Sequence, residues 1–200
     1  MTRTADEAAA AAQSLGFPVV LKALSDKLLH KSDIGAVLLD LADEAAVRRG
    51  AAIIAENARR AGLAEPLEGL LVCEQVQGGT ELAFGAQRDP EMGSVVMAGS
   101  GGVLLELMHD VCFAALPLTL AEARKLIERT RVAHLLGGYR GARAHDMNAL
   151  ALALLAVAQL AEDLDESLSS IDVNPVVSRP NHQPVALDAV IVLRGVGARS

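Results

Sequence analysis

One lysine and one histidine stand out in the first 40 residues, because they lie within and between apolar runs. Residues 18–39 read PVVLKALSDKLLHKSDIGAVLL, which predicts a strand, a polar loop that carries His30, and a second strand. Such a loop presents reactive side chains while the backbone on either side stays paired. Lys22 lies inside the first run, and a buried cation needs an anion nearby. The alternative is an edge-strand lysine that reaches to water.

A second group of polar residues lies near the carboxyl end. The segments IDVNPVV and PVALDAVIV predict two strands joined by a polar turn. Asp172 and Asn174 are two residues apart and so share one face of their strand, and Asp188 lies in the partner strand. Oxygen ligands on adjacent strands suit Mg²⁺, which takes one or two carboxylates together with substrate phosphates. A hairpin whose polar face is only solvated gives the same pattern.

A glycine-rich run, Gly99–Gly102, follows directly on a predicted strand at 94–98. Backbone without side chains can approach a phosphate closely and direct its N–H groups at it. The run is not a Walker loop and lacks the GxGxxG spacing of dinucleotide-binding turns, so a flexible turn between strands is the alternative. Residues 103–118 predict one or two further strands. Glu106 lies among apolar residues there and is either a ligand or the polar face of a strand.

The remaining elements follow from caps, periodicity and turn residues. Capping-box patterns predict helices at 8–15 and from 119 to about 130, and apolar patterns predict helices at 43–61 and 147–164. Strands are predicted at 19–24, 36–41, 68–77, 80–87 and 94–98, with Gly78-Gly79 closing a hairpin, and a final hairpin spans 169–193. The fold class is therefore α/β (α+β) with largely antiparallel strands, not a strict βαβ alternation.

The composition restricts the classes of partner. An apolar fraction of 52% with 22% charged residues is typical of a globular chain. A net charge of −7 with 2% aromatic residues argues against nucleic acid, and the apolar helical stretch Ala149–Ala158 is too short to cross a bilayer. Cys73 and Cys112 form no CxxC pair, which favours a reduced, cytoplasmic setting. We therefore expect no nucleic-acid and no membrane partner.

Together, these stretches resemble the ATP-grasp domain of the NDP-forming acyl-CoA synthetases. That group includes the β subunit of ADP-forming acetate–CoA ligase and, more distantly, the β subunit of succinyl-CoA synthetase. The matching segments occur in the family's order from about Leu15 to Leu193 and include GFPVVLK, LLHKSDIGAV, EQVQGGTEL, GAQRDPEMGSVVM, LLGGYRG and IDVNPVV. The resemblance implies one ATP-grasp domain over residues 1–200, with a smaller nucleotide lobe at about 16–76 and a larger Mg²⁺ and phosphate lobe at about 77–200. Because family members carry more residues before GFPVVLK, the N-terminal part of the fold is expected to be missing.

The resemblance also implies roles for individual residues. Lys22 is similar to the lysine that contacts nucleotide phosphate, and Asn174 and Asp188 match the Mg²⁺ ligands. His30 matches a histidine that takes a phosphoryl group from a first phosphohistidine on the CoA-binding subunit and passes it to ADP. The nucleotide-binding positions are matched by Glu74 and Val76 on the adenine side, Glu81 on the ribose side, and Gly99, Gly101 and Gly102 with Glu106 on the phosphate side.

The implied function is a nucleotide-binding, phosphohistidine-shuttling component of an ADP-forming acyl-CoA synthetase, with ATP or ADP and Mg²⁺ as cofactors. A neutral imidazole is a suitable nucleophile near pH 7, and phosphoryl transfer asks mostly for positioning and charge neutralisation. The CoA-binding domains are absent from this sequence. We therefore expect a partner subunit or domain that carries the first phosphohistidine, a homo- or hetero-oligomer, and no complete reaction by this chain alone.

Two departures from the family pattern keep other functions open. Gly35-Ala36 stands where members usually have two glycines, and Val190 stands where many have arginine. One alternative is a non-catalytic regulatory or partner-binding module, as in domains fused to a protein acetyltransferase. Another is an ATP-grasp ligase that joins a carboxylate to an amine through an acyl phosphate, which would not need His30.

Overall fold

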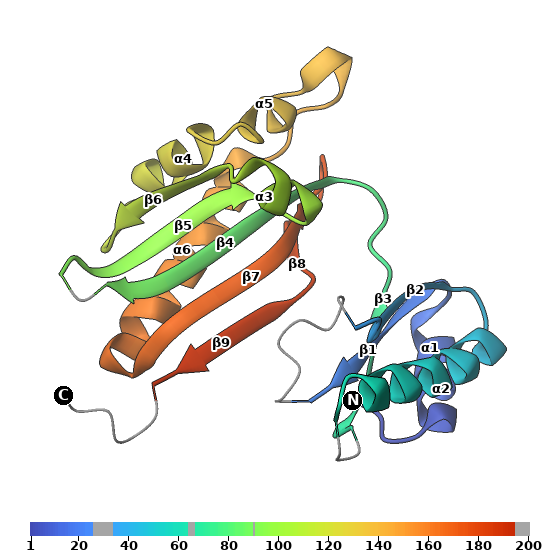
Figure 1. Ribbon diagram of the computed structural model, residues 1–200. Helices are drawn as coiled ribbons and strands as arrows, with labels where there is room; N and C mark the ends of the chain where they lie inside the picture. Colours follow the sequence, from blue (N-terminus) through green and yellow to red (C-terminus); the bar gives the residue numbers. More distant parts are fainter. Residues whose placement is uncertain (26–33, 64–66, 90, 195–200) are drawn as a thin grey trace. The chain divides into compact units, whose positions relative to one another are not determined.

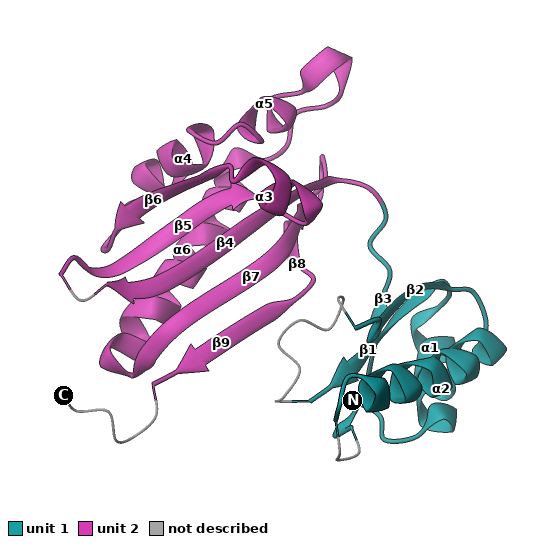
Figure 2. Ribbon diagram, in the orientation of Figure 1, with its two compact units in different colours: residues 1–77 teal, residues 78–200 magenta. Residues whose placement is uncertain are grey.

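The computed structural model describes residues 1–25, 34–63, 67–89 and 91–194. The chain divides into two compact units, Met1–Gln77 and Gly78–Ser200, which Figure 2 shows in different colours. Each unit has its own antiparallel sheet and its own cluster of buried apolar residues. The mixed α/β fold class with antiparallel sheets is confirmed.

Unit 1 is a three-stranded sheet, in the order β2-β1-β3, with two helices that share its core (Figure 1). Its elements are α1 (Ala5–Leu15), β1 (Val19–Leu24), β2 (Val37–Leu41), α2 (Glu44–Arg60) and β3 (Gly69–Glu74). The helix residues in the core are mostly alanine, which lets the helix backbones come close to the strands. Val19, Leu21 and Ile54 are fully buried and provide the bulk of the core.

Both helices of unit 1 begin at side-chain caps, of which the sequence analysis predicts the one at Thr4. The Thr4 hydroxyl accepts from the Glu7 N–H at 3.1 Å, and the Asp43 carboxylate accepts from the Ala46 N–H at 2.6 Å. The Glu7 carboxylate accepts from the Arg3 N–H at 2.7 Å, where a capping box would use the Thr4 N–H. Thr4 is therefore a one-sided cap.

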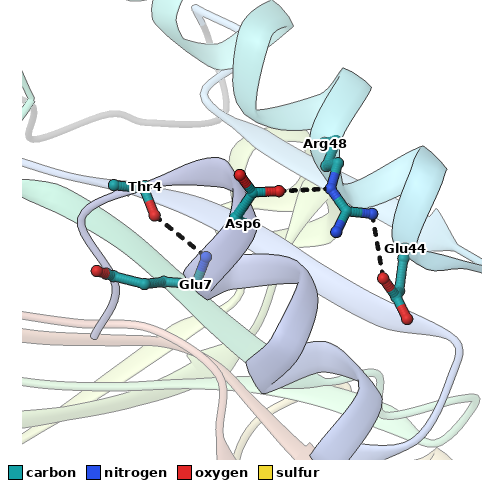
Figure 3. A network of polar contacts seen from close by, with 5 residues as sticks. All are labelled: Thr4, Asp6, Glu7, Glu44 and Arg48. Atoms are coloured by element: carbon teal, nitrogen blue, oxygen red, sulfur yellow. Dashed lines mark hydrogen bonds and ion pairs between the residues drawn. The ribbon is translucent and has the colours of Figure 1, made fainter.

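An exposed ion-pair network joins the two helices of unit 1. Arg48 on α2 donates to Asp6 on α1 at 2.7 Å and to Glu44 on its own helix at 3.1 Å, beside the Thr4 cap (Figure 3). Exposed pairs of this kind contribute little to stability, because water screens the charges and the long side chains lose freedom. The helices are held mainly by their apolar contact with the sheet.

Unit 2 is a six-stranded antiparallel sheet, in the order β6-β5-β4-β7-β8, with a last strand, β9, also paired to β7. Its strands are β4 (Thr80–Asp89), β5 (Gly93–Ser100), β6 (Val111–Ala115), β7 (Leu168–Ser178), β8 (Val185–Ala186) and β9 (Ala189–Leu193). Its helices are α3 (Val103–Met108), α4 (Leu120–Glu128), α5 (Ala133–Leu136) and α6 (Met147–Leu164), with short 3-10 turns at Tyr139–Gly141 and Asp165–Ser167. The helices α4 and α6 cover one face of this sheet (Figure 1), and Phe84 is fully buried beneath them.

The helix α6 is the core helix of unit 2. By length and composition alone, Met147–Ser167 is apolar enough to cross a membrane, which the shorter stretch in the sequence analysis did not show. Leu150, Leu154 and Ala161 are fully buried against α4 and the sheet. This packing accounts for the apolar composition of the helix, so composition by itself is weak grounds for a membrane span.

Two predictions about the chain path are wrong. The strands on either side of Gly78-Gly79 form no hairpin, because β3 pairs with β1 while β4 pairs with β5 and β7. Strand period does not select the partner strand, and the residues between β3 and β4 connect the two units. Residues 103–108 are the helix α3 and not a strand, because a short apolar run does not distinguish the two. Glu106 therefore lies on α3.

Candidate functional site

Most of the predicted residues of unit 2 meet at Gly99–Gly102, which are the last two residues of β5 and the two glycines after it and are called the glycine turn below. The Gly101 N–H donates to the Glu81 carbonyl at 2.9 Å, which ties the turn to the start of β4. The Gly102 N–H donates to the Asn174 side-chain oxygen at 2.9 Å, across 72 residues of sequence. The Asn174 N–H donates in turn to the Asp188 carbonyl at 3.2 Å. These hydrogen bonds therefore involve five sequence-predicted residues, Glu81, Gly101, Gly102, Asn174 and Asp188.

Close packing explains why glycine stands in the turn. A Cβ atom on Gly101 would overlap the backbone carbonyl oxygen of Leu82, and one on Gly102 would overlap the carboxylate of Glu81. Gly102 also has a φ of +55°, which favours glycine. The Glu81 side chain thus lies directly beside the turn. Any larger residue at either glycine would displace the start of β4 or this carboxylate.

The backbone N–H groups of the glycine turn form hydrogen bonds within the protein. The Ser100, Gly101 and Gly102 N–H groups all donate to protein oxygens in unit 2. From the sequence alone, such groups can face a phosphate, or the run can be a flexible turn between strands. The structure shows them fixing the shape of the turn and the orientation of the Asn174 amide.

Asn174 and Asp188 have the chemistry that a hard cation needs. Asn174 is half-buried on β7, and its side-chain oxygen keeps a second lone pair beyond the bond from Gly102. Asp188 lies between β8 and β9, just outside the strand in which it was predicted. Among the described residues, no group of three or more His, Cys, Asp or Glu is placed to hold a metal. This pair of oxygen donors fits Mg²⁺ bound with phosphate and water as further ligands.

Asp110, which the sequence analysis did not single out, lies behind the glycine turn and is only 8% exposed. Burial alone would raise the pKa of its carboxyl and is the largest single influence. Hydrogen bonds from the Arg131 N–H, the Ser100 hydroxyl and the Val132 N–H together outweigh burial, so the pKa lies below its usual range. No sequence pattern reveals this residue, because its partners lie ten and more positions away.

In unit 1, Lys22 lies in the middle of the central strand. It pairs with Val37 of β2 on one side and with Leu71 of β3 on the other, and it is 9% exposed. The alternative of an edge-strand lysine is therefore wrong, because β1 has a strand on each side. The structure keeps a cation within the sheet, as the apolar run PVVLKA predicts.

The predicted adenine-side residues lie at the end of β3 and just after it. Glu74 is the last residue of that strand and is exposed, and Val76 lies in the connection after it. Gln75, between them, exchanges two hydrogen bonds with Asp40 of β2, at 2.7 and 2.6 Å. The start of the connection is therefore anchored to the sheet of unit 1.

The predicted nucleophile, His30, lies outside the described residues. Glu106 is exposed on α3, and none of the hydrogen bonds described here joins it to the glycine turn. Of the described histidines, His145 has a defined partner: its Nδ1 lies 2.8 Å from the hydroxyl of Ser178. Burial lowers the pKa of the His145 imidazole.

Antiparallel sheets in two units, a buried lysine in one, and an asparagine with an aspartate beside a glycine turn in the other are features of an ATP-grasp domain. Residues 1–193 match the ATP-grasp domain family, and the chain belongs to it. Within that family it matches the β subunits of ADP-forming acetate–CoA ligases. Subunit beta of acetate–CoA ligase (ADP-forming) II from Pyrococcus furiosus is 35% identical over 196 residues, which are 98% of this chain and 83% of that protein.

A longer relative and a solved structure extend the comparison. Acetate–CoA ligase (ADP-forming) I from Archaeoglobus fulgidus is 39% identical over 88% of this chain, but the match covers only 25% of that protein. The dinucleotide-forming acetyl-coenzyme A synthetase 1 of Ca. Korarchaeum cryptofilum, in complex with coenzyme A, Ca-AMPCP and HgCl⁺, is 37% identical with a TM-score of 0.90, covering 97% of this chain and 84% of that one. A second structure of that enzyme, with coenzyme A and Mg-AMPPCP, has its phosphohistidine segment pointing towards the nucleotide binding site, at 36% identity, a TM-score of 0.80 and coverages of 96% and 85%.

Proposed function

We propose that this chain is the nucleotide-binding component of an ADP-forming acyl-CoA synthetase, and that His30 carries a phosphoryl group between a partner's phosphohistidine and ADP. The overall reaction converts acyl-CoA, ADP and phosphate to a carboxylate, ATP and CoA. The observation that carries the proposal is the linked set of Gly102, Asn174 and Asp188. It supplies hard oxygen donors beside a glycine turn, in a chain that matches acetate–CoA ligase β subunits.

In this proposal each unit contributes residues that bind the nucleotide or neutralise its phosphate charge. Lys22 in β1 supplies a fixed cation for nucleotide phosphate, and the carboxylate of Glu81 beside the glycine turn accepts from the ribose hydroxyls. Asn174 and Asp188 would hold Mg²⁺, which would neutralise phosphate charge when bound. Glu74 and Val76, next to the anchored Gln75, serve the adenine ring. Gly99, Gly101 and Gly102 keep Asn174 oriented.

The transfer step at His30 balances without any further reactant. A terminal phosphate oxygen of ADP attacks the phosphorus of phospho-His30, the P–O bond forms and the P–N bond breaks. The second ring nitrogen carries a proton in the phosphorylated form, so the electron pair that returns to the first nitrogen leaves a neutral imidazole ready for the next phosphoryl group. The reverse step loads His30 from ATP.

A partner that binds CoA belongs to this proposal, and so does assembly into a homo- or hetero-oligomer. The chain spans most of a relative named as a β subunit and a quarter of a single-chain ligase, so in the relatives the same domain occurs both as a subunit and as part of a longer chain. We further propose a cytoplasmic location, which the free thiols of Cys73 and Cys112 support. By itself the chain would not complete the acyl-CoA reaction.

Incubation with γ-labelled ATP and Mg²⁺ tests the shuttle. Label on the natural chain should be stable to alkali and labile to acid, and it should disappear in His30→Ala. The matched control is His182→Ala, an exposed histidine in the turn between β7 and β8, which should retain the label. Label that persists in His30→Ala would rule out the shuttle. A chain that binds Mg-ATP but takes no label would be the non-catalytic module.

A further inference from the structure

A buried carboxylate and a buried hydroxyl meet at the base of the glycine turn. Ser100 is 2% exposed and Asp110 is 8% exposed. The Ser100 hydroxyl donates to the Asp110 carboxylate at 2.7 Å, and the Ser100 N–H donates to the Asp110 carbonyl at 3.0 Å. The backbone and the side chain of one turn residue are therefore both bonded to one aspartate.

The segment around Arg131 and Val132 also holds Asp110. Its carboxylate accepts from the Arg131 N–H at 2.9 Å and from the Val132 N–H at 3.1 Å, just before α5. It thus joins the end of β5, the start of β6 and the segment that leads into α5. A carboxylate held by several donors is a rigid anchor, because moving it would leave buried polar groups unsatisfied.

We infer that Asp110 and Ser100 are positioning residues for nucleotide binding, which act by holding the glycine turn in the shape that orients Asn174. Only Gly101 separates Ser100 from Gly102, whose N–H donates to the Asn174 side-chain oxygen. Two glycines have no side chains of their own to anchor them, so the shape of the turn depends on the bonds at its ends. The inference rests on the proposed function, in which Asn174 is a Mg²⁺ ligand.

Ser100→Ala removes the hydrogen bond from the Ser100 hydroxyl to the Asp110 carboxylate and leaves the other bonds to Asp110 in place. The Arg131 and Val132 N–H groups keep their bonds to Asp110, so the segment before α5 is unaffected. The turn then spends part of its time in other shapes. The apparent dissociation constant for a ligand that needs the ordered shape rises in inverse proportion to the fraction that remains.

The chain offers a matched control in the same unit. Ser178 is also 2% exposed, and its hydroxyl has a side-chain partner at 2.8 Å, His145, instead of an aspartate. None of the contacts described here ties its side chain to the glycine turn. Ser178→Ala therefore removes a buried hydroxyl with a hydrogen bond of similar length without touching the anchor.

Calorimetric titration with AMPPCP, in Mg²⁺ and without it, tests the inference. Ser100→Ala should bind Mg-AMPPCP roughly three- to tenfold more weakly than the natural chain, and it should need more Mg²⁺ for half-saturation. Its affinity for metal-free AMPPCP should be unchanged. Ser178→Ala should stay within about twofold of the natural chain in both titrations. Asp110→Asn, which keeps the size of the side chain, should weaken Mg-AMPPCP binding in the same direction and covers the case in which Ser100→Ala does not fold.

Equal affinity losses in Ser100→Ala and Ser178→Ala would overturn the inference, because the anchor would then be merely structural. A loss in Ser100→Ala of the same size with and without Mg²⁺ would also overturn it, since the turn would not act through Asn174. If the natural chain bound no Mg-AMPPCP, the proposed function itself would fail. That outcome is visible before any variant is compared.

Discussion

The two units hold their candidate residues in different ways. In unit 1, strand register places Lys22 opposite Val37 and Leu71, and Glu74 simply ends the neighbouring strand. In unit 2, the Gly102–Asn174 bond and the Ser100–Asp110 bond cross between segments, and no single strand fixes them. A position set by register survives a side-chain change, whereas a turn held by individual hydrogen bonds does not. The four predictions below test this difference.

The largest effect is expected at the glycine turn. Gly101→Ala would drive a Cβ into the Leu82 carbonyl, which belongs to a central strand of the sheet and cannot yield easily. We expect a loss of about 3 kcal/mol in the free energy of unfolding, measured by urea titration, together with loss of Mg-AMPPCP binding.

Gly137→Ala is the control for the turn. Its added Cβ would meet only the Ala133 and His134 carbonyl oxygens at 3.8 Å, an ordinary contact, and the residue has helical backbone angles. Stability should change by less than about 1 kcal/mol. Equal losses at Gly101 and Gly137 would show that the turn is no more tightly packed than an exposed helix end.

The second prediction concerns the anchor of the same turn. Asp110→Asn should lower the free energy of unfolding by about 2 kcal/mol at pH 7, because an amide cannot accept all the hydrogen bonds that the carboxylate accepts. The pKa of Asp110 is lowered in the folded protein, so its contribution is present above the ordinary aspartate pKa of about 3.9. It is lost as the pH falls through the lower pKa of the folded state. Urea titrations of the natural chain and the variant should therefore converge in strong acid, and a constant gap would contradict this account.

Unit 1 should respond in the opposite way, with a small change in stability and a large change in binding. Lys22→Met keeps the length of the side chain within β1 and removes the charge. We expect stability to change by about 1 kcal/mol or less, while the affinity for Mg-AMPPCP falls about tenfold or more. Thermal unfolding and calorimetry on the same sample separate the two effects. A variant that unfolds as readily as Gly101→Ala would show that Lys22 is chiefly a structural residue.

The same difference explains what the sequence could predict. The helix starts at Thr4 and Thr119 are recognisable because each cap involves residues three positions apart. The antiparallel character follows from the lack of a strict βαβ alternation and from the hairpin signals near the carboxyl end, and the buried Lys22 follows from an apolar run of strand length. These features depend on neighbours in the sequence, so one sequence is enough to find them.

What the sequence could not show depends on contacts between distant segments. The predicted hairpin at Gly78-Gly79 failed because the partners of β3 and β4 are chosen by the whole sheet. Glu106 was assigned to a strand because a six-residue apolar run carries no decisive period. Asp110 was missed because its donors, at positions 131 and 132, come near it only in the folded chain.

The smallest effect is expected at His145, which contacts Ser178, the last residue of β7. Burial lowers the pKa of its imidazole in the folded protein, so the unfolded chain binds the proton more readily. Stability should therefore fall as the pH drops through the ordinary histidine pKa of about 6.5. His145→Gln, which does not titrate, should flatten this part of the stability curve between about pH 8 and pH 5.5. None of the contacts described here joins the His145 side chain to the glycine turn, so Mg-AMPPCP affinity at pH 8 should stay the same. A change there would mean that the His145–Ser178 contact is coupled to the turn through β4, where Ser178 pairs with Thr80 next to Glu81.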